Sequence, residues 1–148
     1  MQDIRVLDGG LAVDDRGTVS FVNGFDFSDV KRFYKIENFS KNVIRAFHGH
    51  LKEGKYVYVA KGSIILGAVA LDNVQNPSKT AKMNRFVLSG RKPNIVFIPA
   101  GYANGFRILE DDTQVLFFST STLDESKGDD YRFPADYWGN QVWEIENR

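Results

Sequence analysis

The feature of this sequence that most constrains its fold is a series of short runs rich in valine, isoleucine, phenylalanine and tyrosine. Clusters of glycine, asparagine, aspartate or serine separate the runs, and no long segment repeats its apolar residues with the period of a helix. Because β-branched and aromatic side chains suit a pleated surface, each run predicts a strand. The predicted strands are Gly17–Val22, Lys31–Asn38, Val43–His48, Lys55–Lys61, Ser63–Leu71, Asn84–Leu88, Asn94–Ile98, Gly105–Ile108 and Gln114–Thr120.

Turn residues stand between these runs. Pairs such as Lys61-Gly62, Asp72-Asn73 and Asn76-Pro77 predict tight reversals of the chain, as does the acidic stretch Glu110–Asp112. So many short strands must protect their edges, and closure into a barrel or a two-sheet sandwich does this. The sequence therefore predicts an all-β fold, either a jelly roll or a double-stranded β-barrel.

The length of the chain predicts one domain. Its 148 residues, 43% of them hydrophobic, suffice for one compact core. We therefore expect a single domain over residues 1–148. The last part, residues 124–148, begins polar and then becomes aromatic, which predicts a tail that packs back on the barrel. The aromatic residues concerned are Tyr131, Phe133, Tyr137, Trp138 and Trp143.

Charge and cysteine content exclude several classes of function. The basic and acidic residues number 19 each, so no overall field attracts nucleic acid or an anionic membrane. The absence of cysteine excludes disulfides and thiolate chemistry. Neither an apolar signal core near Met1 nor a run of ~20 apolar residues is present. We expect a cytoplasmic protein that binds neither nucleic acid nor membrane.

Both histidines of the chain lie in one segment, Arg45-Ala46-Phe47-His48-Gly49-His50. Residues two apart in a strand share a face, so His48 and His50 are expected to point into the barrel and Phe47 away from it. An imidazole that titrates near neutral pH suits proton transfer. Imidazoles are also ordinary hydrogen-bonding groups, so the residues alone leave a catalytic and a structural role open.

Two segments resemble the paired motifs of cupins. The first is His48-x-His50 with Glu53 and Gly62, and the second is Pro99–Asn104. In metal-binding cupins the second motif ends in histidine, where this chain has Asn104. Since transition metals require several imidazole or carboxylate ligands, and Glu53 comes early for the pattern, we expect no metal and no other cofactor.

The order of six motifs resembles the dTDP-4-dehydrorhamnose 3,5-epimerase family over most of the chain. A single such motif carries little weight, whereas six in the correct order rarely arise by chance. The motifs are Asp15-Arg16-Gly17, Asn38 with Ser40, Arg45–His48, Gly54–Val57, Ile98–Phe106, and the block from Tyr131 through Asp136 to Trp143.

This resemblance implies an isomerase in which His48 is the base, Asp136 orients it, and Lys55 lies near the 4-keto oxygen of a nucleotide-linked sugar. A proton beside a ketone becomes removable when the developing enolate is stabilised, and positive charge from Lys55 or Arg45 suits that task. The resemblance also implies that a guanidinium, that of Arg16, engages the diphosphate.

The same resemblance implies a homodimer whose first strands, around Arg16 and Phe21, cross to a partner barrel. It further implies a group of substrate-binding residues in addition to the catalytic set. These residues are Tyr34, Asn38, Arg45, Tyr102 and Asn104.

One departure from the family affects the expected reaction. The tyrosine that returns a proton to the opposite face of the sugar would fall near Phe117, which has no ionisable group. The enzyme is therefore expected to invert one carbon only, to use Tyr34, Tyr102 or a water as donor, or to carry out another proton transfer.

Two other functions remain open. Lys31–Tyr34 followed by Arg45-x-x-His48-x-His50 resembles the dTDP-sugar 3,4-ketoisomerases, which move a keto group through an enediol. The motifs after Ile98 resemble the epimerases more, so epimerisation is the favoured hypothesis. A pocket of this kind could also bind a sugar nucleotide without reaction.

Overall fold

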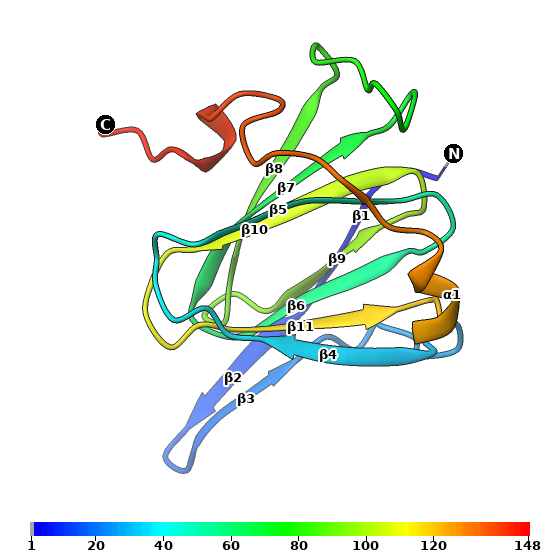
Figure 1. Cartoon of the computed structure of the whole chain (residues 1–148). Coiled ribbons are helices and arrows are strands. Elements are labelled where there is room, and N and C mark those ends of the chain that lie inside the picture. The colour runs from blue at the N-terminus through cyan, green and yellow to red at the C-terminus, as the bar shows by residue number, and fades with distance from the viewer. Residues whose placement is uncertain (1) are drawn as a thin grey trace.

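A computed structural model describes residues 2–148 as two five-stranded antiparallel sheets that lie face to face (Figure 1). The first sheet has the order β1-β9-β6-β11-β4 and the second β12-β5-β10-β7-β8. Strands of the first sheet are β1 (Arg5–Asp8), β4 (Arg32–Ile36), β6 (Lys55–Lys61), β9 (Asn94–Ile98) and β11 (Gln114–Ser119). Those of the second are β5 (Ile44–His50), β7 (Ser63–Ala70), β8 (Met83–Ser89), β10 (Tyr102–Ile108) and β12 (Tyr131–Arg132).

The main core fills the space between the sheets. Alternate residues of each strand face it, as the two-residue period of a strand requires. Their burial removes apolar surface from water, which is the dominant favourable contribution to folding. The buried residues of this core include Val57, Val59, Ile64, Leu66, Val96, Ile98, Phe106, Ile108, Val115 and Phe117.

The chain after β12 crosses the outer face of the second sheet. Trp143, only 2% exposed, lies in the short 3₁₀ helix Gln141–Trp143. It packs on Phe47 with ring centroids 5.4 Å apart, and Trp138 contacts the same ring at 4.9 Å. Backbone hydrogen bonds also join Phe47 and Phe133 in both directions. The aromatic tail is thus a second core, on the side of β5 away from the sheet interface.

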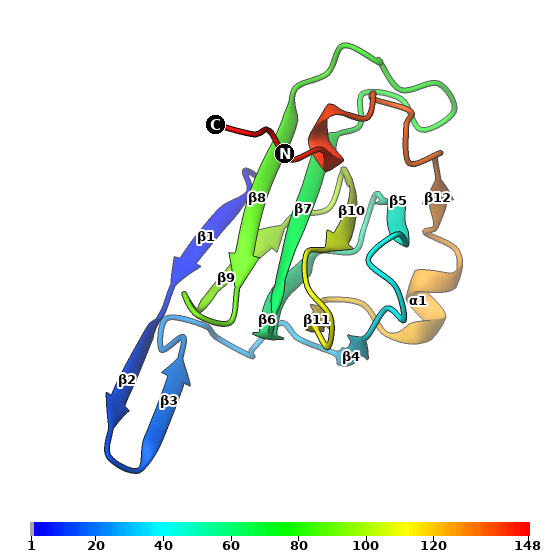
Figure 2. The same ribbon diagram turned by 90° about the vertical axis from the view of Figure 1, so that its left-hand side faces the viewer.

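A separate hairpin extends from the two sheets (Figure 2). It consists of β2 (Gly10–Asp14) and β3 (Gly17–Phe21), and almost all of its residues are exposed. The turn between the strands needs Gly17, whose φ of 136° lies in a region that side-chain-bearing residues rarely adopt. Arg16 lies at the tip, where its Nη2 is 2.6 Å from Asp14 Oδ2.

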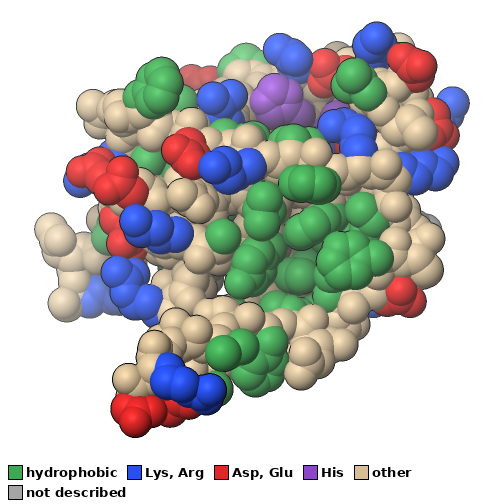
Figure 3. Space-filling model, turned by 90° about the horizontal axis from the view of Figure 1, so that it is seen from below, with side chains coloured by type: hydrophobic (Ala, Val, Ile, Leu, Met, Phe, Trp, Pro, Cys, Tyr) green, Lys and Arg blue, Asp and Glu red, His purple; other side chains and the backbone are tan. Residues whose placement is uncertain are grey.

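The outer face of the first sheet is apolar. Its hydrophobic side chains gather in one area of the surface, shown in Figure 3. Phe27 and Phe33 are 62% and 67% exposed there. We call this surface the apolar face; a shallow groove on it is lined by Phe27, Val30, Lys31, Arg32, Phe33, Leu116 and Phe118.

The predicted all-β jelly roll is confirmed, and each predicted strand is present with ends that differ by up to a few residues. The sequence did not predict β1, β2, β12 or the helix α1 (Leu123–Lys127). β1 and β12 are short and carry charged residues, so their pairing depends on neighbouring strands and not on their own pattern. No helix within residues 2–148 is long and apolar enough to cross a membrane.

Candidate active site

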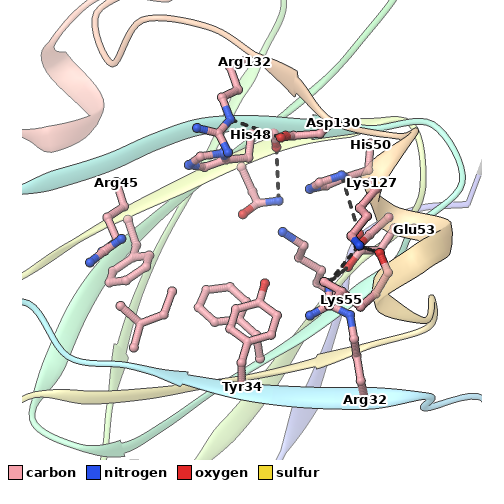
Figure 4. A pocket seen from close by; sticks show the side chains of 16 residues that line it. Arg32, Tyr34, Arg45, His48, His50, Glu53, Lys55, Lys127, Asp130 and Arg132 are labelled. Atoms are coloured by element: carbon pink, nitrogen blue, oxygen red, sulfur yellow. Dashed lines mark hydrogen bonds and ion pairs between the residues drawn. The ribbon is translucent and has the colours of Figure 1, made fainter.

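An open cavity of about 350 Å³ lies between the two sheets, next to α1. Figure 4 shows the side chains that point into it. Apolar residues of the core form one part of its wall, and ionisable residues form the other. The lining residues are Arg32, Tyr34, Ile36, Arg45, His48, His50, Glu53, Lys55, Asn104, Phe106, Phe117, Leu123, Ser126, Lys127, Asp130 and Arg132.

β5 brings both imidazoles to this cavity. The two-residue period of the strand directs His48 and His50 inward, while Phe47 packs against the aromatic tail on the other face. β10 pairs with β5 so that Asn104 lies opposite His48, and its Nδ2 donates to the His48 carbonyl oxygen over 3.5 Å. Asn104 therefore supports the backbone of the strand that carries the histidines.

The surroundings of His48 favour its neutral form. Partial burial lowers the pKa of His48, and the positive charges of Lys55 and Arg132 lower it further. The carboxylate of Asp130 acts in the opposite direction. A neutral imidazole that lines the cavity is free to accept a proton.

Lys55 lies at the start of β6 and is only 8% exposed. Burial lowers the pKa of its ammonium group, and the charge of Glu53 partly offsets this effect. Its Nζ lies 5.8 Å from the centroid of the Phe117 ring. The group is thus a more acidic donor than a lysine in water, placed beside the two imidazoles.

Tyr34 occupies the wall opposite the histidines. It is the cross-strand partner of Phe117, and the two rings stack with centroids 5.3 Å apart and an interplanar angle of 9°. Burial raises the pKa of the Tyr34 phenol, so it carries its proton at neutral pH. A protonated phenol is therefore available on the strand next to Phe117.

Cationic side chains stand at the mouth of the cavity. Lys127 and Arg132 are 68% and 72% exposed, and both line the cavity. Arg45 is also exposed at the mouth, where its Nε donates to Asn38 Oδ1 over 2.6 Å. Such groups suit a ligand that carries phosphate charges.

Four of the residues suggested by the sequence do not line the cavity. Asp136 is exposed in the turn 135–138, because the chain after β12 leaves the cavity and crosses the outer face of the second sheet. Arg16 lies at the exposed hairpin tip, and Tyr102 is buried at the start of β10 without lining the cavity. Asn38 contacts the cavity only through Arg45.

The carboxylate beside His48 is instead Asp130. β12 pairs with β5 so that Arg132 lies opposite His48, and Arg132 Nε donates to Asp130 Oδ2 over 3.1 Å. The sequence analysis did not single out Asp130, Arg132, Lys127 or Arg32 as site residues. The only signal for the first two was that charged residues directly precede and interrupt the aromatic tail.

Residues 2–148 contain no group of three or more histidine, cysteine, aspartate or glutamate side chains arranged to hold a metal ion. His48, His50 and Glu53 all line the cavity, yet Glu53 is held by other partners. Its Oε2 accepts from Ser119 Oγ over 2.5 Å and lies 3.4 Å from Arg32 Nη2. The absence of a catalytic metal remains a prediction.

Fold and site together define a cupin whose cavity carries two imidazoles, a buried lysine and a protonated phenol, which is a set of groups for proton transfer. Residues 2–135 match the dTDP-4-dehydrorhamnose 3,5-epimerase family. The chain therefore belongs to this family of isomerases, as its six motifs predicted.

Individual relatives agree with this assignment. The chain is 28% identical over 128 residues to the spore coat polysaccharide biosynthesis protein SpsL of Bacillus subtilis, covering 83% of this chain and 82% of that protein. In fold it resembles the rmlC epimerase of Mycobacterium tuberculosis with a TM-score of 0.73 and 20% identity, over 89% of this chain and 69% of that one.

It also resembles the 3,4-ketoisomerase QdtA from Thermoanaerobacterium thermosaccharolyticum, solved in complex with TDP. The TM-score is 0.67 and the identity 16%, over 95% of this chain and 94% of that one. The fold is thus shared by epimerases and ketoisomerases, and the residues of the cavity must distinguish the two reactions.

Proposed function

We propose that the protein is an epimerase that acts on a nucleotide-linked 4-keto-6-deoxyhexose, removes the proton next to the ketone, and inverts C3 only. The observation that carries this proposal is the joint placement of His48 and Lys55 in one cavity. A base and a positive charge are the two groups that enolate formation requires.

In the proposed reaction, the neutral imidazole of His48 takes the proton from C3. The electron pair of the broken C–H bond forms a C3–C4 double bond, and the carbonyl π electrons move to the oxygen at C4. The ammonium group of Lys55 stabilises the resulting enolate. When the enolate collapses, C3 takes a proton on its other face and the carbonyl forms again.

Tyr34 is the proposed donor of that second proton. It lines the cavity, is protonated at neutral pH, and stacks on Phe117. Because it comes from β4 in the first sheet while His48 comes from β5 in the second, the two groups approach a bound sugar from different walls. This arrangement supports inversion at one carbon.

The cationic residues at the mouth of the cavity support a substrate with a nucleotide diphosphate, which they would bind and so hold the sugar in place. Arg45, Lys127 and Arg132 supply charge and hydrogen-bond donors there. The structure of QdtA was determined with TDP, which makes dTDP the first nucleotide to test. We place the enzyme in the cytoplasm as part of the same proposal.

A 3,4-keto shift is a second candidate, favoured by His50. A ketoisomerase must move protons between neighbouring positions on one region of the sugar, and both imidazoles face the same cavity from one strand. Tyr34 lies opposite them. This reaction would need both histidines, whereas epimerisation needs His50 only as part of the wall.

The test is incubation of the purified protein with dTDP-4-keto-6-deoxyglucose in heavy water, followed by NMR. Deuterium at C3 with inverted configuration supports the epimerase. A product with its ketone at C3 shows the ketoisomerase instead. Unchanged substrate that nevertheless protects the protein against thermal unfolding would make the chain a binding protein.

His50→Asn sharpens the comparison. An epimerase should keep part of its rate, whereas a ketoisomerase that uses both imidazoles should lose nearly all of it. A parallel reaction after treatment with a chelator tests metal independence. Loss of turnover that returns with a divalent metal would overturn that prediction.

We further propose a homodimer formed through the apolar face and the hairpin. Exposed aromatic residues such as Phe27 and Phe33 form a patch that a second copy would remove from water. Arg16, 86% exposed at the end of the hairpin, is remote from its own cavity wall and could reach the nucleotide site of the partner. The dimer thus supports a role for Arg16 that one chain alone does not allow.

A further inference from the structure

The two imidazoles of the cavity differ in how they are held. His50 Nδ1 lies 2.5 Å from the backbone carbonyl oxygen of Asp129 and 3.6 Å from Glu53 Oε1. A carbonyl oxygen can only accept a hydrogen bond, and so can an ionised carboxylate. Nδ1 must therefore carry the hydrogen in the neutral ring.

The other ring nitrogen of His50, Nε2, then has no hydrogen and carries a lone pair that can accept one. Nε2 is buried and has no hydrogen-bond partner among residues 2–148, and the His50 side chain lines the cavity. A buried acceptor without a partner is costly unless a ligand satisfies it. This nitrogen is thus placed to accept a proton from a bound molecule.

Asp129 is held in position by its own carboxylate. This side chain accepts the backbone N–H groups of three successive residues, over 2.7 Å from Leu51, 2.9 Å from Lys52 and 3.0 Å from Glu53. Asp129 is only 3% exposed. The carboxylate therefore holds the segment after α1 against the turn after β5. This contact keeps the backbone carbonyl oxygen of Asp129 next to the ring of His50.

Glu53 completes the surroundings of the ring. Ser119 and Arg32 both bind its Oε2, while Oε1, which has no hydrogen-bond partner among residues 2–148, lies on the side of His50 Nδ1. Its side chain is 0% exposed. A buried negative charge here favours the positively charged form of the imidazole.

We propose that Asp129 and Glu53 are positioning residues that make His50 Nε2 a second proton acceptor in the cavity. Asp129 fixes the tautomer of the ring, and Glu53 stabilises the imidazolium after proton transfer. The proton enters and leaves through Nε2, and no other bond of the residue changes. The inference deepens the second candidate function, the 3,4-keto shift, which needs both imidazoles, and rests on it for the identity of the proton source.

The electrostatics of the ring agree with this role. Burial lowers the pKa of His50, and Lys55 lowers it further. The hydrogen bond to Asp129 and the charges of Glu53 and Asp129 raise it. These opposing influences keep the ring neutral before the reaction while leaving the charged form accessible.

The first test is NMR of the ring nitrogens in protein labelled with ¹⁵N-histidine, without substrate. The chain has only two histidines, so a His48→Gln variant assigns both sets of signals. At a pH above its pKa, His50 should be in the Nδ1–H form. A ring protonated at Nε2, or a freely exchanging mixture, would overturn the proposal.

The second test is Asp129→Asn, with Asp111→Asn as the control. An amide NH₂ cannot accept from a backbone N–H, so this contact loosens and His50 should become a tautomer mixture. Because Asp129 no longer orients His50, turnover should fall by roughly 10- to 100-fold, and the loss should appear in kcat more than in KM. Asp111, exposed in the turn between β10 and β11, should change neither quantity.

Glu53→Gln provides an independent measurement in case Asp129→Asn fails to fold. It should leave the tautomer of His50 unchanged but lower its pKa in an NMR titration, because the stabilising charge is removed. An unchanged or raised pKa would contradict the role of Glu53. Since these spectra need no substrate, a correct tautomer in a protein without turnover would count against the proposed function alone.

Discussion

At the scale of single residues, the cavity gives each proton-carrying group a different environment. His48 is half-buried beside Asp130 and Arg132, whereas His50 is buried against Asp129 and Glu53. Tyr34 stays protonated on the opposite wall. Groups whose surroundings separate their pKa values can act as base and acid in one reaction at one pH.

We expect His48→Asn to abolish exchange of the C3 proton with solvent, by at least about 100-fold, because an amide cannot accept a proton at neutral pH. Substrate binding should survive, since the mouth of the cavity is unchanged. NMR in heavy water and calorimetric binding would measure the two effects. A variant that exchanges the proton as fast as the parent would require a different base.

We expect Asp130→Asn to move the acidic limb of the kcat/KM profile to lower pH. The Asp130 carboxylate raises the pKa of His48, so its loss lowers that pKa and keeps the base neutral in more acidic solution. Asp136→Asn, in an exposed turn outside the cavity, is the matched control and should leave the profile unchanged. The reverse result would show that Asp136 reaches His48 after all.

At the scale of elements, the short helix α1 forms one wall of the cavity through Leu123, Ser126 and Lys127. A capping box fixes its start. Thr122 Oγ1 accepts from the Glu125 backbone over 3.2 Å, and the Glu125 side chain accepts from the Thr122 backbone over 2.9 Å. Lys31 Nζ, 3.0 Å from Glu125 Oε1, ties the helix to the first sheet.

We expect Thr122→Ala to lower the free energy of unfolding by about 1 kcal/mol, the usual cost of a lost N-cap. Because the helix carries part of the cavity wall, KM should rise more than kcat falls. Urea unfolding and steady-state kinetics would measure the two quantities. Thr80→Ala, in an exposed loop, serves as the control, and equal effects in both variants would contradict a role for the cap.

At the scale of the whole molecule, the apolar face is a group of hydrophobic side chains that one chain leaves exposed. We expect light scattering to show a dimer at micromolar concentration, and Phe33→Glu to shift it towards a monomer, because a charge placed in the interface would have to lose its water. Val87→Glu, at a 57% exposed position on β8 of the other sheet, should remain dimeric. A monomeric parent protein would refute the dimer.

We expect the free energy of unfolding to fall as the pH drops from 7 to 5. Burial lowers the pKa of both folded imidazoles below the ordinary value of 6.5, so the unfolded chain binds more protons in this range. The lowered pKa values of Glu110 and Glu125, each about 2, matter only below about pH 4.5. A double variant, His48→Asn with His50→Asn, should therefore show a flatter dependence in urea unfolding.

The sequence by itself determined the all-β architecture and the strand of the two histidines. Strand alternation and turn residues are local properties, so Val43–His48 could be placed as a strand, with His48 and His50 on one face. The six motifs also identified the family, because their order is visible in the chain.

Only the tertiary structure decided which distant residues meet the histidines. β12 places Asp130 and Arg132 beside His48 through two residues of pairing, and three backbone N–H groups bring Asp129 against His50. The same path carries Asp136 away from the cavity. Such contacts join positions about 80 residues apart, and their geometry depends on the packing of whole strands, which no local pattern of side chains encodes.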